Sequence, residues 1–155
     1  MKTFNFNLFI WVLLASHSFS IVAAPPRFVV GWGGNISGNV TGIPYSGNST
    51  GVVVIADQVL SNVVAISAGI HHSLAIKSDG TVVGWGDNGG GRATGLKSAY
   101  PYRDSGVVTI YGKILSNAVA ISACRFSAAL KSDGTVALWG LDGSGYNISM
   151  LYIRA

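Results

Sequence analysis

The sequence predicts an all-β fold built from repeated units, and three observations carry this prediction. The stretch SNVVAISAGIHHSLAIKSDGTVVGWG at residues 61–86 returns as SNAVAISACRFSAALKSDGTVALWG at residues 116–140, and a shorter echo, FVVGWG, stands at residues 28–33. In both full copies an Asp-Gly pair separates two apolar runs, which is a strong β-hairpin signal. The chain also has 21 glycines and no glutamate, a composition that favours short strands over helices.

The spacing of the copies is regular. Trp85 follows Trp32 by 53 residues and precedes Trp139 by 54. The linkers repeat as well, as GVVVIADQVLSN from Gly51 and GVVTIYGKILSN from Gly106. A period of this order is typical of solenoids, propellers and arrays, in which each unit packs against its neighbours.

The first element, Met1–Ala24, is predicted to be a secretory signal peptide. Lys2 supplies the positive start, Leu8–Ala15 is apolar, and the small residues Ala23 and Ala24 offer a cleavage site. The alternative is a membrane anchor, but the apolar run is shorter than the ~18 residues that a spanning helix needs. A signal implies a secreted protein, extracellular or periplasmic, with no membrane span after its removal.

The following elements are predicted to be strands, because apolar residues alternate with polar ones or form short β-branched runs. In order, the predicted strands are residues 28–33, 51–60, 63–66, 73–76 and 81–85, and their counterparts in the second copy. Residues 34–50 and 87–105 are expected to be long loops. The tail after residue 140 contains one further strand candidate, Ile148–Ile153.

The stretch SAGIHHSLAIKSDGTVVGWGDN resembles the repeat of the regulator-of-chromosome-condensation family. The matching framework positions in the two copies are His72, Asp79, Gly80, Trp85, Gly86, Asp133, Gly134, Trp139 and Gly140. The second copy departs from the pattern, since Phe126 aligns with His72 and Leu141 stands before Asp142.

The resemblance implies a β-propeller, which in this family normally has seven four-stranded blades. This chain would then be a partial propeller of two to three four-stranded antiparallel blades, too few for a closed ring. The expected organisation is a signal at 1–24, repeats over 25–145 and a tail at 146–155; the repeats divide into a partial blade 27–50 and repeats 51–105 and 106–145. Truncation of a larger propeller, closure by self-association and a small stack of sheets remain open as explanations.

No motif for catalysis, metal or cofactor binding is predicted. His71 and His72 have no further ligands at useful spacing, and the acidic residues after Asp87 are too few for a calcium loop. The six aspartates offer no defined acid–base pair, and no nucleophile elbow is present. A single cysteine, Cys124, excludes an intrachain disulfide. The protein is therefore predicted not to be an enzyme.

Four Asn-x-Ser/Thr sequons stand at Asn35, Asn39, Asn48 and Asn147. In a eukaryotic secretory pathway these asparagines are glycan acceptors, and the first three are expected on one exposed loop. In a bacterium they are polar loop residues only.

The loop 87–105 offers the best candidate binding surface, because tyrosine and arginine are the residue types of interaction hot spots. Its candidate binding residues are Arg92, Lys97, Tyr100, Tyr102 and Arg103. The net charge of +4 is too small and scattered for nucleic acid.

The predicted function is a secreted, non-catalytic protein-interaction module with an unidentified protein partner. Nuclear members of the resembled family act as nucleotide-exchange factors for a small GTPase, but the predicted signal peptide and the missing blades argue against that role here. The alternative function is none: a truncated or decayed fragment of a larger propeller. An enzyme, or an inhibitor that caps an enzyme with one propeller face, is the distant alternative.

Overall fold

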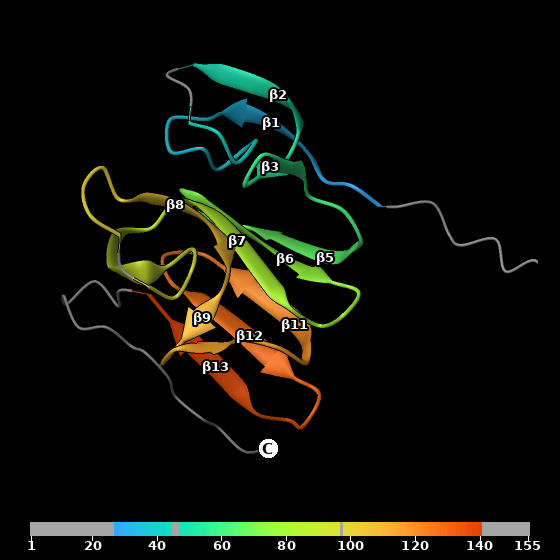
Figure 1. Cartoon of the computed structure of the whole chain (residues 1–155). Coiled ribbons are helices and arrows are strands. Elements are labelled where there is room, and N and C mark those ends of the chain that lie inside the picture. The colour runs from blue at the N-terminus through green and yellow to red at the C-terminus, as the bar shows by residue number, and fades with distance from the viewer. Residues whose placement is uncertain (1–26, 45–46, 97, 141–155) are drawn as a thin grey trace, which may run out of the picture.

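The computed structural model describes residues 27–44, 47–96 and 98–140 (Figure 1). Within these residues the chain forms thirteen β-strands and one short 3-10 helix, Gly89–Gly91. The predicted signal peptide and the whole of the predicted tail, with its strand candidate Ile148–Ile153, lie outside the described residues. The prediction of an all-β fold is confirmed.

The first sheet has two antiparallel strands, β1 (Val30–Gly34) and β2 (Asn48–Val52), in which Trp32 lies opposite Thr50. A small hairpin follows, made of β3 (Val54–Ile55) and β4 (Gln58–Val59).

The middle sheet is a complete four-stranded antiparallel blade. Its strands are β5 (Val63–Ala68), β6 (His72–Lys77), β7 (Val82–Asp87) and β8 (Arg103–Val107), and they lie in the sheet in the order of the sequence. A second small hairpin follows, made of β9 (Thr109–Ile110) and β10 (Lys113–Ile114).

The last sheet contains β11 (Ala118–Ala123), β12 (Ser127–Lys131) and β13 (Val136–Trp139), again in sequence order. The three sheets stack side by side (Figure 1). By repeat position, β1 and β2 correspond to β7 and β8, so the first blade contributes its last two strands to the described structure and the third blade its first three.

Two apolar clusters join the sheets, and they use matching repeat positions. Between the first and middle blades, Val29, Val53 and Leu60 pack with Val83 and Trp85. Between the middle and third blades, a cluster at the corresponding positions contains Val82, Val108, Leu115, Ala137 and Trp139, and it also includes Leu74 and Ile76 of β6. The repeated sequence is therefore a repeated packing unit.

One predicted strand and the ends of both predicted loops need correction. Residues 51–60 are not one strand, because Ala56 and Asp57 both adopt left-handed backbone angles (φ 50° and 62°) and turn the chain into the β3–β4 hairpin. The long loops also end earlier than predicted, since β2 begins at Asn48 and β8 at Arg103. In residues 27–44, 47–96 and 98–140, no helix is long and apolar enough to cross a membrane.

Candidate functional site

The two Asp-Gly turns explain two of the framework aspartates. Asp79 Oδ1 accepts hydrogen bonds from the backbone N–H and the hydroxyl of Thr81 (2.9 and 2.6 Å), and Asp133 Oδ1 accepts the same pair from Thr135 (3.0 and 2.6 Å). The threonine hydroxyl bonds lower the pKa of Asp79 and lower that of Asp133 to about 2. Gly80 and Gly134 follow with φ of 79° in both turns. These aspartates therefore stabilise turns and are poorly suited to proton transfer.

Two buried asparagines, Asn35 and Asn88, hold the long loops, and the sequence analysis did not identify either role. The Oδ1 of Asn88 accepts from the N–H groups of Ala93 and Thr94, while its Nδ2 donates to the Thr94 hydroxyl, the Leu96 carbonyl and Asp104. Asn35 makes the matching set of contacts with its own loop. The sequence signal for this pair was the recurrence of Trp-Gly-x-Asn after 53 residues.

This anchoring changes the prediction for the sequons. Asn35 is fully buried and donates its Nδ2 hydrogens to protein acceptors, so the expectation that it stands on an exposed loop is wrong. Asn39 is half-buried, Asn48 is exposed at the start of β2, and Asn147 lies outside the described residues. Among the sequons of the described residues, Asn48 is the most accessible.

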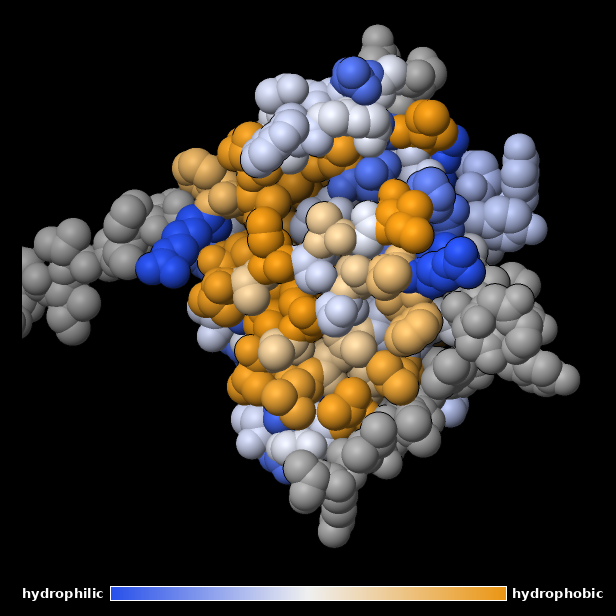
Figure 2. Space-filling view, turned by 180° about the vertical axis from the view of Figure 1, so that it is seen from behind, coloured by the Kyte–Doolittle hydropathy of each residue, from blue (hydrophilic) through white to orange (hydrophobic). Residues whose placement is uncertain are grey.

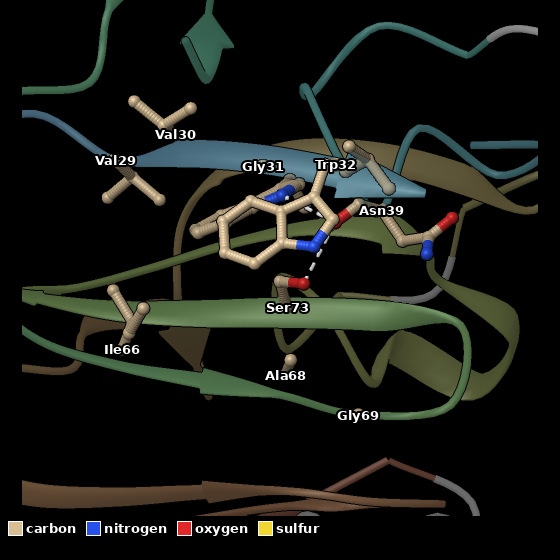
Figure 3. Close-up of a pocket in the computed structure, with 11 residues that line it drawn as sticks. Val29, Val30, Gly31, Trp32, Asn39, Ile66, Ala68, Gly69 and Ser73 are labelled. Carbon is tan, nitrogen blue, oxygen red and sulfur yellow. Dashed lines mark hydrogen bonds between the residues drawn. The ribbon is translucent and has the colours of Figure 1, made fainter. Parts of the chain in front are cut away.

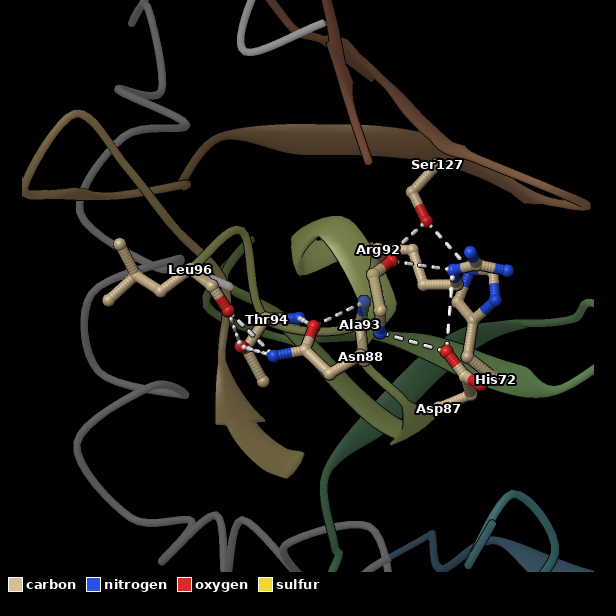
Figure 4. Close-up of polar contacts among 9 residues, drawn as sticks. His72, Asp87, Asn88, Arg92, Ala93, Thr94, Leu96 and Ser127 are labelled. Carbon is tan, nitrogen blue, oxygen red and sulfur yellow. Dashed lines mark hydrogen bonds and ion pairs between the residues drawn. The ribbon is translucent and has the colours of Figure 1, made fainter. Parts of the chain in front are cut away.

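His72 lies at the junction of the middle and third blades (Figure 4). Its Nε2 lies 2.8 Å from the Ser127 hydroxyl, which donates to the backbone carbonyl of Arg92 at 2.7 Å. The Arg92 side chain returns to Asp87, with Nε 3.5 Å from Oδ1. Burial, aided by the charge of Arg92, lowers the pKa of His72 to about 4, so the imidazole is neutral at pH 7.

The junction between the first and middle blades repeats part of this arrangement. Ser73 Oγ and Trp85 Nε1 both donate to the carbonyl of Asn39, at 2.9 and 3.0 Å. Ser73 and Asn39 correspond to Ser127 and Arg92 by repeat position. The same serine-to-carbonyl bond therefore joins both pairs of blades.

The candidate binding residues divide between two places. Arg92 is engaged in the blade junction, and its Nε also donates to the carbonyl of Gly89. Tyr100 and Tyr102 are 83% and 42% exposed and pack edge to face with ring centroids 5.6 Å apart. Arg103 is exposed beside them, at the first position of β8 and not in a loop. Lys97 lies outside the described residues.

An apolar groove of about 260 Å³ runs between β1 and the middle blade. Figure 3 shows side chains of β1 facing those of β5 and β6 across it. Its walls include Val30, Trp32, Ile66, Ala68 and Trp85. Ser73 and Asn39 supply the polar atoms, and both are already hydrogen-bonded to each other.

The side chains that could hold a metal are scattered. Within residues 27–44, 47–96 and 98–140, histidine, cysteine and acidic side chains form no group of three or more. Cys124 is exposed and forms no disulfide bond among the described residues.

Comparison with known proteins supports the repeat and the fold. The sequence model of the Regulator of chromosome condensation (RCC1) repeat matches residues 63–92, which run from β5 to Arg92. The chain thus contains a repeat of this type, and its architecture is that of part of a β-propeller, as predicted.

Three solved structures share this architecture. Human WBSCR16 aligns with a TM-score of 0.57 and 17% identity, covering 81% of this chain and 33% of that one. Prp20p from Saccharomyces cerevisiae, studied for its binding properties to Gsp1p and histones, aligns with a TM-score of 0.55 and 17% identity, covering 83% and 34%. The complex of Kap60 bound to yeast RCC1 (Prp20) aligns with a TM-score of 0.52 and 19% identity, covering 74% and 26%. The chain spans about a third of the length of the structures that it matches, or less.

Proposed function

We propose that this protein is a non-catalytic protein-interaction module that binds a protein partner through the surface formed by Tyr100, Tyr102 and Arg103. One observation carries the proposal: two tyrosines pack edge to face while remaining exposed, on a loop with fixed ends. Aromatic and arginine side chains dominate binding energy at protein interfaces. Tyrosine also loses little conformational entropy when it becomes ordered.

The anchoring of the loop supports a binding role. The backbone N–H of Asn88 donates to the carbonyl of Tyr102, and the N–H of Tyr102 donates to that of Ala99. Because the buried Asn88 side chain also holds Leu96 and Asp104, both ends of the segment are tied to the middle blade. Binding by a surface that is already ordered costs less free energy than binding by a flexible loop.

The solved relatives support the class of function and not the partner. Prp20p is described with binding properties to Gsp1p and histones, and yeast RCC1 is seen with Kap60. Their identity to this chain is below 20%, so we infer binding of proteins as the shared class and leave those partners with Prp20p.

The test compares two variants of the full chain as bait in quantitative affinity capture from its native source. The test variant carries Tyr100→Ser and Tyr102→Ser, and the control carries Tyr111→Ser, which removes an exposed tyrosine from the turn of the β9–β10 hairpin. We expect a protein that is captured by the native chain and the control but lost with the double variant. Direct titration of that protein should then show a loss of about 2 kcal/mol or more, which is roughly thirtyfold in affinity.

The second candidate is a chain with no independent activity. The observation that favours it is the exposure of many large apolar side chains at the blade surfaces, such as Phe28 and Trp32. If capture is identical for the native chain, the double variant and the control, the tyrosine surface has no partner and this second candidate is preferred.

A further inference from the structure

Asn48 differs from the other sequon asparagines of the described residues in the surroundings of its side chain. It is exposed at the start of β2, and its side-chain amide makes no hydrogen bond within the part of the chain that the structure describes. Thr50, which supplies the hydroxyl of the same sequon, is also exposed. Because side chains alternate along a strand, Asn48 and Thr50 lie on one face of β2. Both groups that define a glycan acceptor are therefore accessible together in the folded chain.

Asn35 has no room for a sugar. Its side chain is fully buried, and its Nδ2 lies 2.8 Å from the Thr41 hydroxyl, 2.7 Å from the Ile43 carbonyl and 3.0 Å from the Ser49 hydroxyl. A glycan replaces one of the two hydrogens on Nδ2, so buried acceptors of this loop would lose their donor. A chain that carried a sugar on Asn35 could not close the loop in this way.

The sequon of Asn39 is also used by the fold. Asn39 is half-buried, and its Nδ2 donates to the carbonyl of Gly34 at 3.3 Å. The hydroxyl of this sequon belongs to Thr41, which accepts from Asn35 and donates to the carbonyl of Ile43 at 3.2 Å. Both the amide and the hydroxyl of this sequon are therefore engaged in holding the loop.

The face of the first blade that carries Asn48 is apolar beside it. Val30 and Val52 lie directly opposite each other on this face and are 49% and 39% exposed. In the middle blade the residue that corresponds to Val30 is Val83, which is buried against the first blade. The first blade thus ends the described stack of blades with an uncovered apolar face. Terminal units of repeat proteins need a polar outer face for solubility, and a glycan on Asn48 would supply polar cover at the rim of this one.

We propose that Asn48 carries an N-linked glycan and that Asn35 and Asn39 carry none. The new bond joins Nδ2 of Asn48 to the anomeric carbon of an oligosaccharide donor that is activated as a diphosphate. The bond from that carbon to the diphosphate oxygen breaks, the diphosphate leaves, and Nδ2 gives up one proton. The transfer takes place in a eukaryotic secretory pathway, so the proposal includes the entry of this chain into that pathway. It does not depend on the proposed tyrosine surface.

Glycan occupancy at each site, measured on the protein from its native source, tests the proposal. Chymotryptic cleavage after Tyr45 places Asn48 on a different peptide from Asn35 and Asn39. Release of glycans by a peptide N-glycosidase in heavy-oxygen water converts each occupied asparagine to a labelled aspartate, which mass spectrometry locates. We expect the label at Asn48 and at neither of the other two. Asn147 lies outside the described residues and does not enter the comparison. An unlabelled Asn48, or a label at Asn35 or Asn39, overturns the proposal.

Two variants of the full chain, secreted from a eukaryotic cell line, test the sequon itself. Thr50→Ala removes the hydroxyl that defines the sequon, whereas the matched control Thr50→Ser keeps it. Because Thr50 is exposed, neither change should disturb folding. We expect the intact mass of the Thr50→Ala protein to fall by one glycan relative to the native chain, and that of Thr50→Ser to keep the glycan. A glycan that persists in Thr50→Ala, or a native chain without one, contradicts the assignment.

Discussion

At the scale of single residues, the blade junction fits only one protonation state of the His72 imidazole, the neutral ring with its proton on Nε2. Because the Ser127 hydroxyl gives its proton to the Arg92 carbonyl, its oxygen accepts from Nε2–H of His72. The opposite nitrogen, Nδ1, is buried without a hydrogen-bond partner among the described residues. A second proton would therefore place an unpaired charge in a buried site beside Arg92, which is the physical reason for the lowered pKa of His72.

We expect the free energy of unfolding to fall as the pH drops from 6.5 to about 4. The pKa of His72 is about 4 in the folded chain and 6.5 in the unfolded chain, so in this window the unfolded state binds one more proton. The full loss is about 3 kcal/mol. Denaturant unfolding at a series of pH values measures it. The variant His72→Gln keeps an N–H donor for Ser127 and should flatten this window. The turn aspartates, whose pKa values are lowered, lose their contribution only at pH values below their ordinary range near 4. An unchanged slope in His72→Gln would assign the effect to another group.

Asn88 should be far more sensitive to a one-atom change than an exposed asparagine. In Asn88→Asp a carboxylate oxygen replaces Nδ2 and faces the Leu96 carbonyl and the Asp104 carboxylate, at contacts that are 2.6 and 3.3 Å in the native chain. We expect a loss of about 3 kcal/mol in the free energy of unfolding, because buried acceptors lose their donor and a charge is introduced. Asn48→Asp, the exposed control, should change stability by less than about 0.5 kcal/mol. Similar values for both would contradict the role of Asn88 as a buried anchor.

At the scale of elements, the long loops of the first and middle blades each cross directly over a strand of their own blade. The path leaves no room for a side chain at Gly31 of β1 or Gly84 of β7, where a Cβ would overlap the carbonyl oxygens of Val40 and Ala93. These are corresponding positions, and the loops above them are held by Asn35 and Asn88. The third blade has Leu138 at the same place. Glycine is therefore needed for the close approach of the loop in the first two blades.

Gly31→Ala tests this crossing within a single strand. The added methyl meets backbone, which cannot rotate away, so either the strand or the loop must move. We expect a loss of about 2 kcal/mol or more in the free energy of unfolding. Gly34→Ala is the control, because the nearest atom to its added methyl is the Asn48 side chain at 4.0 Å. Thermal or denaturant unfolding of both variants gives the comparison, and equal losses would mean that the loop does not rest on β1 as described.

The features that the sequence predicted at this scale are those with a local cause. The Asp79-Gly80 and Asp133-Gly134 hairpins follow from residues whose own geometry makes the turn. The Ala56-Asp57 turn was missed because neither residue is glycine, yet the two-residue turn between Ile55 and Gln58 requires left-handed angles at both. Burial of Asn35 was also missed, since it depends on a loop that closes over the side chain. In the candidate surface, residue type alone selected Tyr100, Tyr102 and Arg92 together, and only the folded chain shows that the tyrosines pack on each other while Arg92 lies at the blade junction.

At the scale of the whole molecule, many large apolar side chains are exposed, among them Trp32 at 75% and Ile66 at 63%. Figure 2 shows apolar side chains in a broad band across one face. The edge strands β5 and β11 of neighbouring blades lie in contact, and each exposes a valine at the same repeat position, Val64 at 55% and Val119 at 57%. Contiguous apolar surface and unpaired strand edges both promote association with other chains.

We therefore expect the full chain to self-associate, with an average mass that rises above 16.1 kDa as the protein concentration increases from micromolar to hundreds of micromolar. Sedimentation equilibrium measures this directly. Val64→Lys combined with Val119→Lys places two charges on the edge strands and should hold the mass near that of one chain, because charged edges resist pairing. Val59→Lys, which charges an exposed valine on the β3–β4 hairpin, is the control and should leave association unchanged. If the native chain keeps the mass of a monomer throughout, the exposed valines are tolerated surface. If Val59→Lys disperses the assembly as well as the double variant does, net charge and not the edge strands controls association.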